Sequence, residues 1–296
     1  DAETDALVAL TRKFSEGATL FHSTRDKDTV RQEVAAALQQ FNEQFLLPSR
    51  SRREALLQQL GEGSLAEDDV PRDILTVLLS NRADQDLDDD MILREVAFFM
   101  QAGSHSSANA LTHSFHEISQ WCRHHPKDRD RLMADDHFLQ RCVHESLRLH
   151  PASPVAWRTA SEAFSLPDGT DVAEGDSVVI DLMSANLEAP LFGEDAEVFN
   201  PHRTVAARIP PFGLSFGIGI HTCFGRDIAG GLGDAKTKGE APHLGTLTNL
   251  LKNLMQHDAR PDPANPAVAD AGTERPNWGS YPLMIGQRTT HAGAAI

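Results

Sequence analysis

The chain has 296 residues, of which 40% are hydrophobic, and a formal net charge of -16. That is enough apolar material for one large core or two modest ones, so we expect a globular protein. No apolar stretch approaches the ~18 residues of a membrane span, and no basic and then apolar leader follows Asp1, so neither a membrane anchor nor a secretory signal is expected. The negative charge, with no offsetting Lys/Arg run, argues against nucleic acid as a partner.

Apolar residues recur at helical spacing through the first 60 residues. Examples are Leu7, Leu10, Phe14, Val34, Leu38, Phe41 and Phe45. The pattern predicts two or three amphipathic helices, with turns near Gly17 and Pro48. A loop rich in glycine and acidic residues is expected over residues 61–70.

Three further helices are predicted, over residues 71–81, 88–125 and 136–150. Pro71 suits the first turn of the first helix, where no N–H donor is needed. Aspartates at 88–90 suit the positive N-terminal end of the second, and Pro151 ends the third. Residues 1–150 are therefore expected to form a helical part built around one long helix.

The periodicity changes over residues 151–209, which we expect to be β-rich. Val178, Val179 and Ile180 follow the turn signals Pro167-Asp168-Gly169 and Gly175-Asp176, a pattern that predicts short strands. Residues 210–296 are expected to hold a cysteine loop, a helix interrupted at Gly230, Gly231 and Gly233, a helix over 244–257 and a Pro-rich tail. The whole chain, 1–296, is predicted to be one domain, mainly α with a smaller β-rich part.

The three cysteines, Cys122, Cys142 and Cys223, lie far apart and form no CxxC pair. Neither a disulfide framework nor a zinc knuckle is indicated, and a reducing cytoplasm fits best. The 14 histidines are scattered over helices and loops. His113 and His116 could share a metal ion, but no third ligand is visible.

The most informative segment is 216–225, Phe-Gly-Ile-Gly-Ile-His-Thr-Cys-Phe-Gly. A thiolate bound to iron needs its charge stabilised, and the backbone N–H groups of a glycine-bent loop supply donors aimed at the sulfur. Gly217, Gly219 and Gly225 permit that shape and let the backbone lie close to a flat macrocycle. Phe216 can pack on the face of such a group, and His221 can reach a propionate.

Three alternatives compete for this loop. Cys223 could be a buried cysteine beside a tight turn. A zinc site at His221 and Cys223 would lack a companion ligand pair, and a dinucleotide-binding loop would lack its third glycine.

The segment from Phe216 to Gly225 resembles the haem-binding signature Phe-x-x-Gly-x-His-x-Cys-x-Gly of the cytochrome P-450 family. The resemblance implies a cytochrome P-450-like fold of the soluble bacterial type, with haem b held through Cys223 as the axial iron ligand. Compared with that fold, a large N-terminal part is expected to be absent, including elements that cap the substrate pocket.

Two upstream motifs support the resemblance. Glu145 and Arg148 stand at i, i+3 on one helical face and match the family's Glu-x-x-Arg motif. Arg203, in Phe199-Asn200-Pro201-His202-Arg203, resembles the partner that closes a buried charge network, for which we expect a structural role. Arg158 matches the position of a haem-propionate arginine, although a generic surface arginine is the alternative.

The segment Ala102-Gly103-Ser104-His105-Ser106-Ser107 resembles the family's oxygen-activation motif. Ala102 and Gly103 would lie against haem, while His105, Ser106 and Ser107 would assist proton delivery. The sequence has His105 where an acid is usual and Ser106 where threonine is usual, although both can still handle protons. Alternatively, Gly103 only lets another helix pack closely, and the Ser106 hydroxyl bonds back to the Ala102 carbonyl and bends the helix.

The resemblance implies a haem-thiolate monooxygenase that inserts one oxygen atom of O2 into a small apolar organic substrate. Electrons would come from NAD(P)H through a ferredoxin and ferredoxin reductase or an equivalent. Arg203, Arg208 and Arg226 could dock an acidic redox partner. The alternatives are a non-catalytic or degenerate haem-binding protein, such as a sensor, and a helical scaffold that binds no haem.

Overall fold

The computed structural model describes residues 1–232 and 243–286. The chain divides into two compact units: residues 1–106 with 271–274 form the first unit, and residues 107–270 with 275–296 form the second. The expectation of a single domain stays a prediction. The helix predicted after Cys223 ends at Gly230, where the interruption was expected. Gly233, the last glycine of that predicted interruption, lies outside the described residues.

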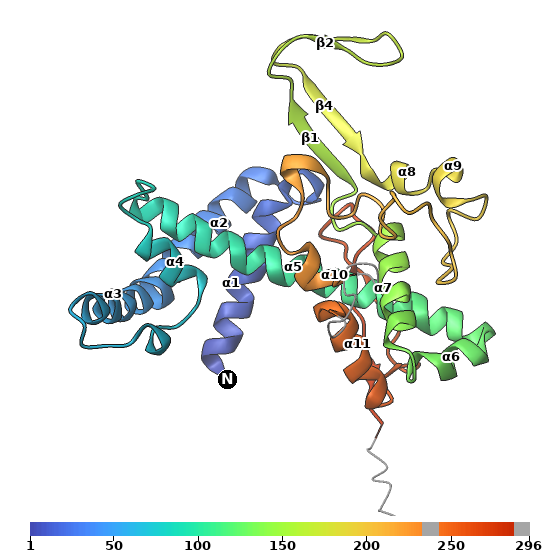
Figure 1. Ribbon diagram of the computed structural model, residues 1–296, viewed down its shortest axis with the longest axis horizontal. Helices are drawn as coiled ribbons and strands as arrows, with labels where there is room; N and C mark the ends of the chain where they lie inside the picture. Colours follow the sequence, from blue (N-terminus) through green and yellow to red (C-terminus); the bar gives the residue numbers. More distant parts are fainter. Residues whose placement is uncertain (233–242, 287–296) are drawn as a thin grey trace, which may run out of the picture. The chain divides into compact units, whose positions relative to one another are not determined.

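The first unit is helical (Figure 1). It contains α1 (Ala2–Ala18), η1 (Leu20–His22), α2 (Lys27–Phe41), η2 (Asn42–Leu46), α3 (Leu47–Gly61), η3 (Glu67–Asp69), α4 (Ile74–Ser80) and the first half of α5 (Asp89–His124). Aspartate side chains cap α1, α2 and α4, because Asp1, Asp26 and Asp73 each accept a hydrogen bond from the backbone N–H three residues on.

Two predicted boundaries in this unit are wrong. Pro48 makes no turn, because it lies in the first turn of α3, where its missing N–H is tolerated. The preceding turn, η2, is a π-helix in which the Leu47 N–H donates to the Asn42 carbonyl, so the chain remains helical from Lys27 to Gly61. The helix expected over 71–81 begins only at Ile74, because the Asp73 side chain caps it.

The helices of the first unit close around a core of their own. Leu10, Phe14, Ala37, Phe41, Leu46, Leu75, Ile92 and Ala97 are buried together there. Phe14 and Phe41 meet edge to face, with ring centroids 5.6 Å apart. The helical spacing seen in the sequence therefore marks residues that do share a core.

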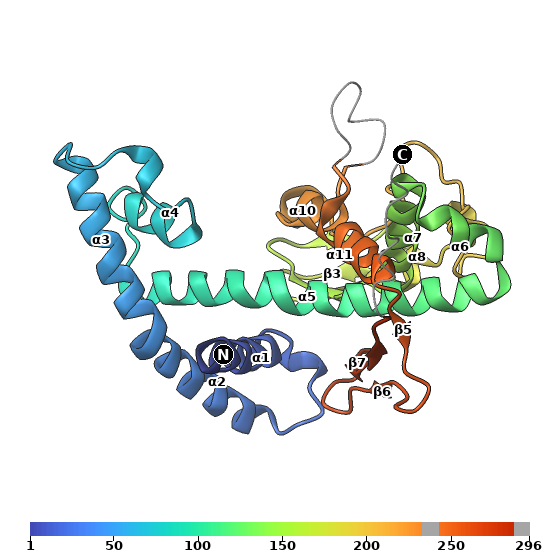
Figure 2. The same ribbon diagram turned by 90° about the horizontal axis from the view of Figure 1, so that it is seen from below.

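The second unit begins with the rest of α5 and continues with α6 (Pro126–Leu132) and α7 (Asp136–Leu149), followed after the strands by α8 (Leu182–Asn186), α9 (Ala189–Phe192), η4 (Gly219–His221), α10 (Arg226–Gly230) and α11 (Gly245–Gln256). Helices α10 and α11 pack against α7 (Figure 2). Their shared core includes Phe138, Leu139, Val143, Leu247 and Leu251. The short helices α6, α8 and α9 were not predicted.

Small sheets complete the second unit. β1 (Val155–Thr159) pairs antiparallel with β4 (Ser177–Asp181), and β2 (Phe164–Ser165) pairs with β3 (Asp171–Val172). In the segment expected to be a Pro-rich tail, β5 (Arg260–Pro261) pairs with β8 (Leu283–Met284) and β6 (Val268–Ala269) with β7 (Trp278–Ser280). The expected class, mainly α with a smaller β-rich part, is confirmed.

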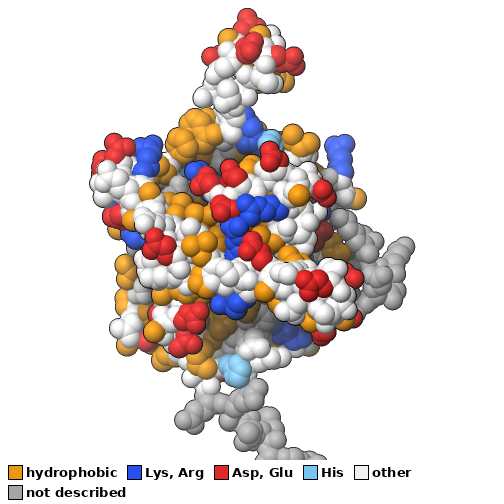
Figure 3. Space-filling model, turned by 90° about the vertical axis from the view of Figure 1, so that its left-hand side faces the viewer, with side chains coloured by type: hydrophobic (Ala, Val, Ile, Leu, Met, Phe, Trp, Pro, Cys, Tyr) orange, Lys and Arg blue, Asp and Glu red, His pale blue; other side chains and the backbone are white. Residues whose placement is uncertain are grey.

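Within the described part of the chain, no helix is both long and apolar enough to cross a membrane. On the face drawn in Figure 3, the described basic side chains are interspersed with acidic and hydrophobic ones. This distribution agrees with the absence of a Lys/Arg run from the sequence.

Candidate functional site

Accessibility separates the three cysteines. Cys142 is buried in the core of the second unit, and burial raises the pKa of its thiol well above the usual value. Burial also raises the pKa of Cys122, to about 11. Cys223 is exposed. Because a metal ligand must be a thiolate, and burial penalises the thiolate form, Cys223 is the cysteine suited to bind a metal.

The loop that carries Cys223 is closed by its own backbone. The Cys223 N–H donates to the Phe216 carbonyl at 2.8 Å, and the Gly217 N–H donates to the Leu214 carbonyl at 2.8 Å. Gly217 has φ +66°, and a Cβ there would lie 2.9 Å from the His221 carbonyl oxygen. Only glycine fits this position without strain, as the sequence led us to expect.

The expected backbone donors to the sulfur are not seen: no described residue forms a hydrogen bond with Cys223 Sγ. Three N–H groups of the loop, those of Gly217, Thr222 and Cys223, donate to nearby backbone carbonyls instead. Gly225 lies against the sulfur, since a Cβ added to it would be 3.7 Å from Sγ. Phe216 packs against the core of the second unit, with its ring centroid 5.0 Å from that of Phe212.

Exposed apolar side chains lie on the chain segment that carries the exposed thiol. Ile220 is 96% exposed and Phe224 97% exposed, and Ile218 and Ile228 are also largely exposed. Large exposed apolar side chains close in sequence to a soft metal ligand fit a flat apolar macrocycle, which would cover them and accept the thiolate. Sequence reasoning did not single out Ile220 or Phe224. The sequence feature that could have identified them is the presence of large apolar residues among glycines and a histidine in a predicted loop.

Two residues were expected to contact a haem propionate, His221 in the loop and Arg158 outside it. His221 is exposed, and its side chain forms no hydrogen bond with any described residue, so it is available to an anionic group. Arg158 lies on β1 and is partly exposed, and its Nη1 donates to the Trp157 carbonyl at 2.7 Å. Both positions are compatible with a haem propionate, a role that stays a prediction.

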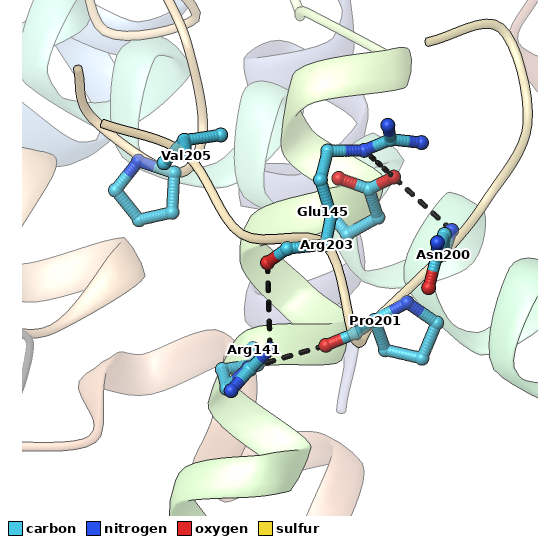
Figure 4. A pocket seen from close by; sticks show the side chains of 7 residues that line it. Arg141, Glu145, Asn200, Pro201, Arg203 and Val205 are labelled. Carbon is cyan, nitrogen blue, oxygen red and sulfur yellow. Dashed lines mark hydrogen bonds and ion pairs between the residues drawn. The ribbon is translucent and has the colours of Figure 1, made fainter. Parts of the chain in front are cut away.

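Glu145, on α7, is the centre of a buried charge network (Figure 4). Arg148 grips its carboxylate with two hydrogen bonds, from Nε at 2.9 Å and from Nη2 at 2.8 Å. Arg203 Nε donates to the same carboxylate at 3.0 Å, and the Asn200 N–H does so at 3.1 Å. Both arginines that the sequence groups with Glu145 therefore donate to its carboxylate.

The guanidinium of Arg203 is fully engaged, because it also bonds Asp195 Oδ1 at 2.6 Å and the carbonyls of Phe192, Asp195 and Val198. Its side chain is only 5% exposed. The expectation that Arg203 could dock an acidic partner is therefore wrong, since burial and pairing remove its charge from the surface. Arg226 pairs with its neighbour Asp227 at 2.8 Å, while Arg208 is exposed.

The oxygen-side motif lies on α5. Ala102, Gly103, His105 and Ser106 belong to the first unit, and Ser107 begins the second. Ser106 Oγ donates to the Ala102 carbonyl at 2.6 Å, as one interpretation of the sequence predicted. A Cβ added to Gly103 would meet no described atom within 4 Å, so no described helix packs closely on Gly103.

His113 and His116, considered above as a pair that lacks a third metal ligand, make other contacts. Among the described residues, no group of three or more His, Cys, Asp or Glu side chains could hold a metal ion. His113 instead stacks on His150, with ring centroids 4.3 Å apart, and His116 Nδ1 lies 3.0 Å from the Tyr281 hydroxyl.

Comparison with known proteins places this arrangement in a family. The sequence profile described as Cytochrome P-450 matches residues 19–230. The chain is similar to cytochrome P-450 4F11 of Homo sapiens, 30% identical over 179 residues, which are 53% of this chain and 34% of the relative. It is also similar to cytochrome P-450 4F4 of Rattus norvegicus, 28% identical over 251 residues, or 76% of this chain and 44% of the relative.

Solved structures agree on the fold. CalO2 superposes with a TM-score of 0.68 at 17% identity, covering 94% of this chain and 60% of CalO2. An open form of the cytochrome P-450 EryK from S. erythraea superposes with a TM-score of 0.65 at 19% identity, covering 98% of this chain and 63% of EryK.

The chain belongs to the cytochrome P-450 family, as the cysteine signature predicted. It spans 34–44% of the length of these two curated relatives and about three fifths of these two solved chains. Haem binding and monooxygenase chemistry are general properties of the family. The bacterial type stays a prediction, because the two curated relatives described above are human and rat proteins.

Proposed function

We propose that this chain is a haem-thiolate monooxygenase that binds haem b through Cys223 and inserts one oxygen atom of O2 into a small apolar organic substrate. The observation that carries the proposal is an exposed cysteine among exposed apolar side chains, in the loop that bears the family signature. When bound, thiolate-ligated haem supplies O2 activation and favours O–O cleavage.

The loop residues would hold the group. Because Gly217, Gly219 and Gly225 have no side chains, they would let the loop backbone lie close to the haem. Phe216 fixes the start of the loop against the core of the second unit. His221 and Arg158 would pair with carboxylates of the cofactor. The network around Glu145, described above, would keep this scaffold rigid.

Residues of α5 would handle protons on the oxygen side, with Ala102 and Gly103 leaving space beside the helix. The hydrogen bond to the Ala102 carbonyl orients the Ser106 hydroxyl and leaves its lone pairs available to a second donor. His105 can take up or release a proton near neutral pH, and Ser107 offers a second hydroxyl. Electrons would come from NAD(P)H through a ferredoxin and its reductase, and a cytoplasmic location is part of the same proposal.

The test is the visible spectrum of the purified, haem-loaded chain after reduction and addition of carbon monoxide. A strongly red-shifted Soret band, lost in Cys223→Ser and retained in the matched variant Cys122→Ser, is the expected result. A band typical of histidine-ligated haem, or no haem uptake, would contradict the proposed ligand.

A second function, a haem-binding protein without turnover, is favoured by one observation: His105 and Ser106 replace the acid and threonine usual in the oxygen-side motif. The two functions differ in substrate-dependent NADPH consumption with product formation. A chain with a thiolate-type spectrum and no turnover on any substrate screened would favour the second function.

A further inference from the structure

Asn186, the last residue of α8, is completely buried, with a side chain that is 0% exposed. A buried asparagine is costly unless its amide is hydrogen-bonded, so its partners reveal what it does. It lies 37 residues before Cys223 in the sequence and belongs to none of the motifs described above.

The Asn186 side chain joins the C-terminal end of α7 to the segment that leads to Cys223. Its Nδ2 donates to the Arg148 carbonyl at 3.0 Å and to Ser215 Oγ at 3.1 Å, and its Oδ1 accepts from the Leu214 N–H at 2.7 Å. Ser215 Oγ in turn donates to the Leu147 carbonyl at 2.6 Å. The NH2 group and the oxygen of the Asn186 amide are therefore both hydrogen-bonded. The NH2 group bonds to α7 and to Ser215, and the oxygen bonds to Leu214.

The same residue also contacts the charge network. The Asn186 carbonyl accepts a hydrogen bond from Arg148 Nη1 at 2.7 Å, the arginine nitrogen that Glu145 does not bind. Arg148 thus holds the backbone of residue 186, and residue 186 holds the segment 214–215. This is a continuous hydrogen-bonded path from Glu145 to the cysteine loop.

Gly213 shows how closely the segment is held. Its φ is +59°, and a Cβ there would lie 2.2 Å from Asn186 Oδ1, far inside contact distance. Glycine is therefore required for this approach. One residue beyond the held segment, the Phe216 carbonyl accepts the Cys223 N–H, so a shift at residues 214–215 would pass directly to the cysteine.

We propose that Asn186 is a positioning residue for the Cys223 thiolate: its side-chain amide fixes the segment Gly213–Ser215 to α7 and thereby sets the orientation of the loop that presents the sulfur. The inference rests on the proposed haem-thiolate function, because the orientation of the sulfur matters only toward a bound metal. The amide itself contacts no reacting atom.

The test compares Asn186→Leu, which keeps the branched shape and the number of side-chain heavy atoms and removes all three side-chain hydrogen bonds, with Asn277→Leu. Asn277 is also a buried asparagine of the second unit, but it faces His113 and has no link to the cysteine loop. Full-length haem-loaded chains are reduced and treated with carbon monoxide. In Asn186→Leu, the ratio of thiolate-type to neutral-ligand Soret absorption should fall about tenfold, the order expected when buried polar partners are left unpaired. In Asn277→Leu the ratio should not change.

A haem-free measurement covers the case in which Asn186→Leu folds poorly. Ser215→Ala removes one link of the path, and Asn186→Asp keeps the acceptor for the Leu214 N–H while losing both donors. Amide hydrogen exchange at Leu214, Gly217 and Cys223 should be several-fold faster in Ser215→Ala than in wild type, while exchange in α5 is unchanged. The spectral ratio should be intermediate in Asn186→Asp.

The outcomes are distinguishable. A wild-type chain without a thiolate-type band would overturn the proposed function itself. A wild-type chain with that band, together with equal ratios in Asn186→Leu and Asn277→Leu and equal amide exchange in Ser215→Ala and wild type, would overturn the positioning role alone.

Discussion

Glu145 accepts four hydrogen bonds from Arg148, Arg203 and Asn200 while almost completely buried. Its carboxylate is the only carboxylate that pairs with Arg148 among the described residues, whereas Arg203 has a second one in Asp195. The two carboxylates on Arg203 therefore differ mainly in burial, since the Asp195 side chain is 49% exposed.

We predict that Glu145→Gln lowers the free energy of unfolding by about 3–5 kcal/mol, because it leaves the buried Arg148 charge uncompensated. Asp195→Asn should cost only about 1 kcal/mol or less, because the Asp195 carboxylate is 49% exposed and its charge is screened by water. Urea unfolding of the two variants at neutral pH measures the difference. Equal losses would show that burial of the Glu145 carboxylate is not what matters.

His113 provides a pH-dependent contribution to stability. It is buried and stacked on His150, and Asn277, Glu117 and His116 also lie near it. Burial, followed by the neighbouring His150, lowers the pKa of His113 from 6.5 to about 4. The folded chain therefore binds a proton on this ring less readily than the unfolded chain does.

Because the folded-state pKa is lowered, the stability that neutral His113 provides is complete above pH 6.5 and falls as the pH drops toward about 4. We expect the wild type to have a higher urea midpoint than His113→Gln at neutral pH, and the difference between the two midpoints to become smaller as the pH is lowered from 6.5 toward about 4. His124→Gln, at an exposed histidine, serves as the control and should show a constant gap. A constant gap for His113→Gln as well would refute the prediction.

At the scale of elements, the junction of α10 and α11 depends on two glycines. Gly231 and Gly245 have φ of +76° and +79°, and their backbones nearly touch: a Cβ on Gly245 would lie 2.4 Å from Gly231 N. Two residues of α7 fix the position of this junction. Gln140 Nε2 donates a hydrogen bond to the Gly230 carbonyl at 3.2 Å, and His144 Nε2 lies 2.8 Å from the same oxygen. The Leu232 N–H also donates to the His243 carbonyl at 2.8 Å.

Gly231→Ala should therefore be severe. Its Cβ would meet the His243 carbonyl oxygen at 2.3 Å and Gln140 Nε2 at 2.4 Å. The matched control, Gly175→Ala, has φ +87° but no atom within 4 Å, so it measures backbone strain alone, about 1–2 kcal/mol. We expect Gly231→Ala to cost about 1–3 kcal/mol more, by overpacking. Similar urea midpoints for the two variants would show that the backbone at the junction of α10 and α11 can move to accommodate the added Cβ.

The sequence predicted elements well where the signal is local. The limits of the long helix, α5, and of α7 agree within one residue with those read from charge and proline positions. The turn predicted at Pro48 was wrong, because the π-turn η2 continues the helix into α3 and Pro48 lies in the first turn of α3. The strands β5 to β8 are too short to show a periodicity in the sequence.

At the scale of the whole molecule, two compact units with separate hydrophobic cores predict two unfolding steps. Phe41→Ala should lower the stability of one step, and Leu251→Ala that of the other, each by about 2–5 kcal/mol. Added haem should raise mainly the step that Leu251→Ala affects, because Cys223, the proposed iron ligand, lies in the same unit. Chemical denaturation followed by circular dichroism and by haem absorbance measures these steps. A single cooperative transition, shifted equally by both variants, would contradict the prediction.

The sequence by itself determined the family signature of the cysteine loop, the i, i+3 pairing of Glu145 with Arg148 and the mainly helical class, because each depends on residues close together along the chain. Only the tertiary structure decided which cysteine is exposed, that Arg203 is buried rather than available for docking, and that Asn186 joins α7 to the cysteine loop. These depend on contacts between residues tens of positions apart, and such contacts leave no periodicity or spacing in the sequence. Burial, which sets the cost of a charge or an unpaired amide, is a property of the folded chain alone.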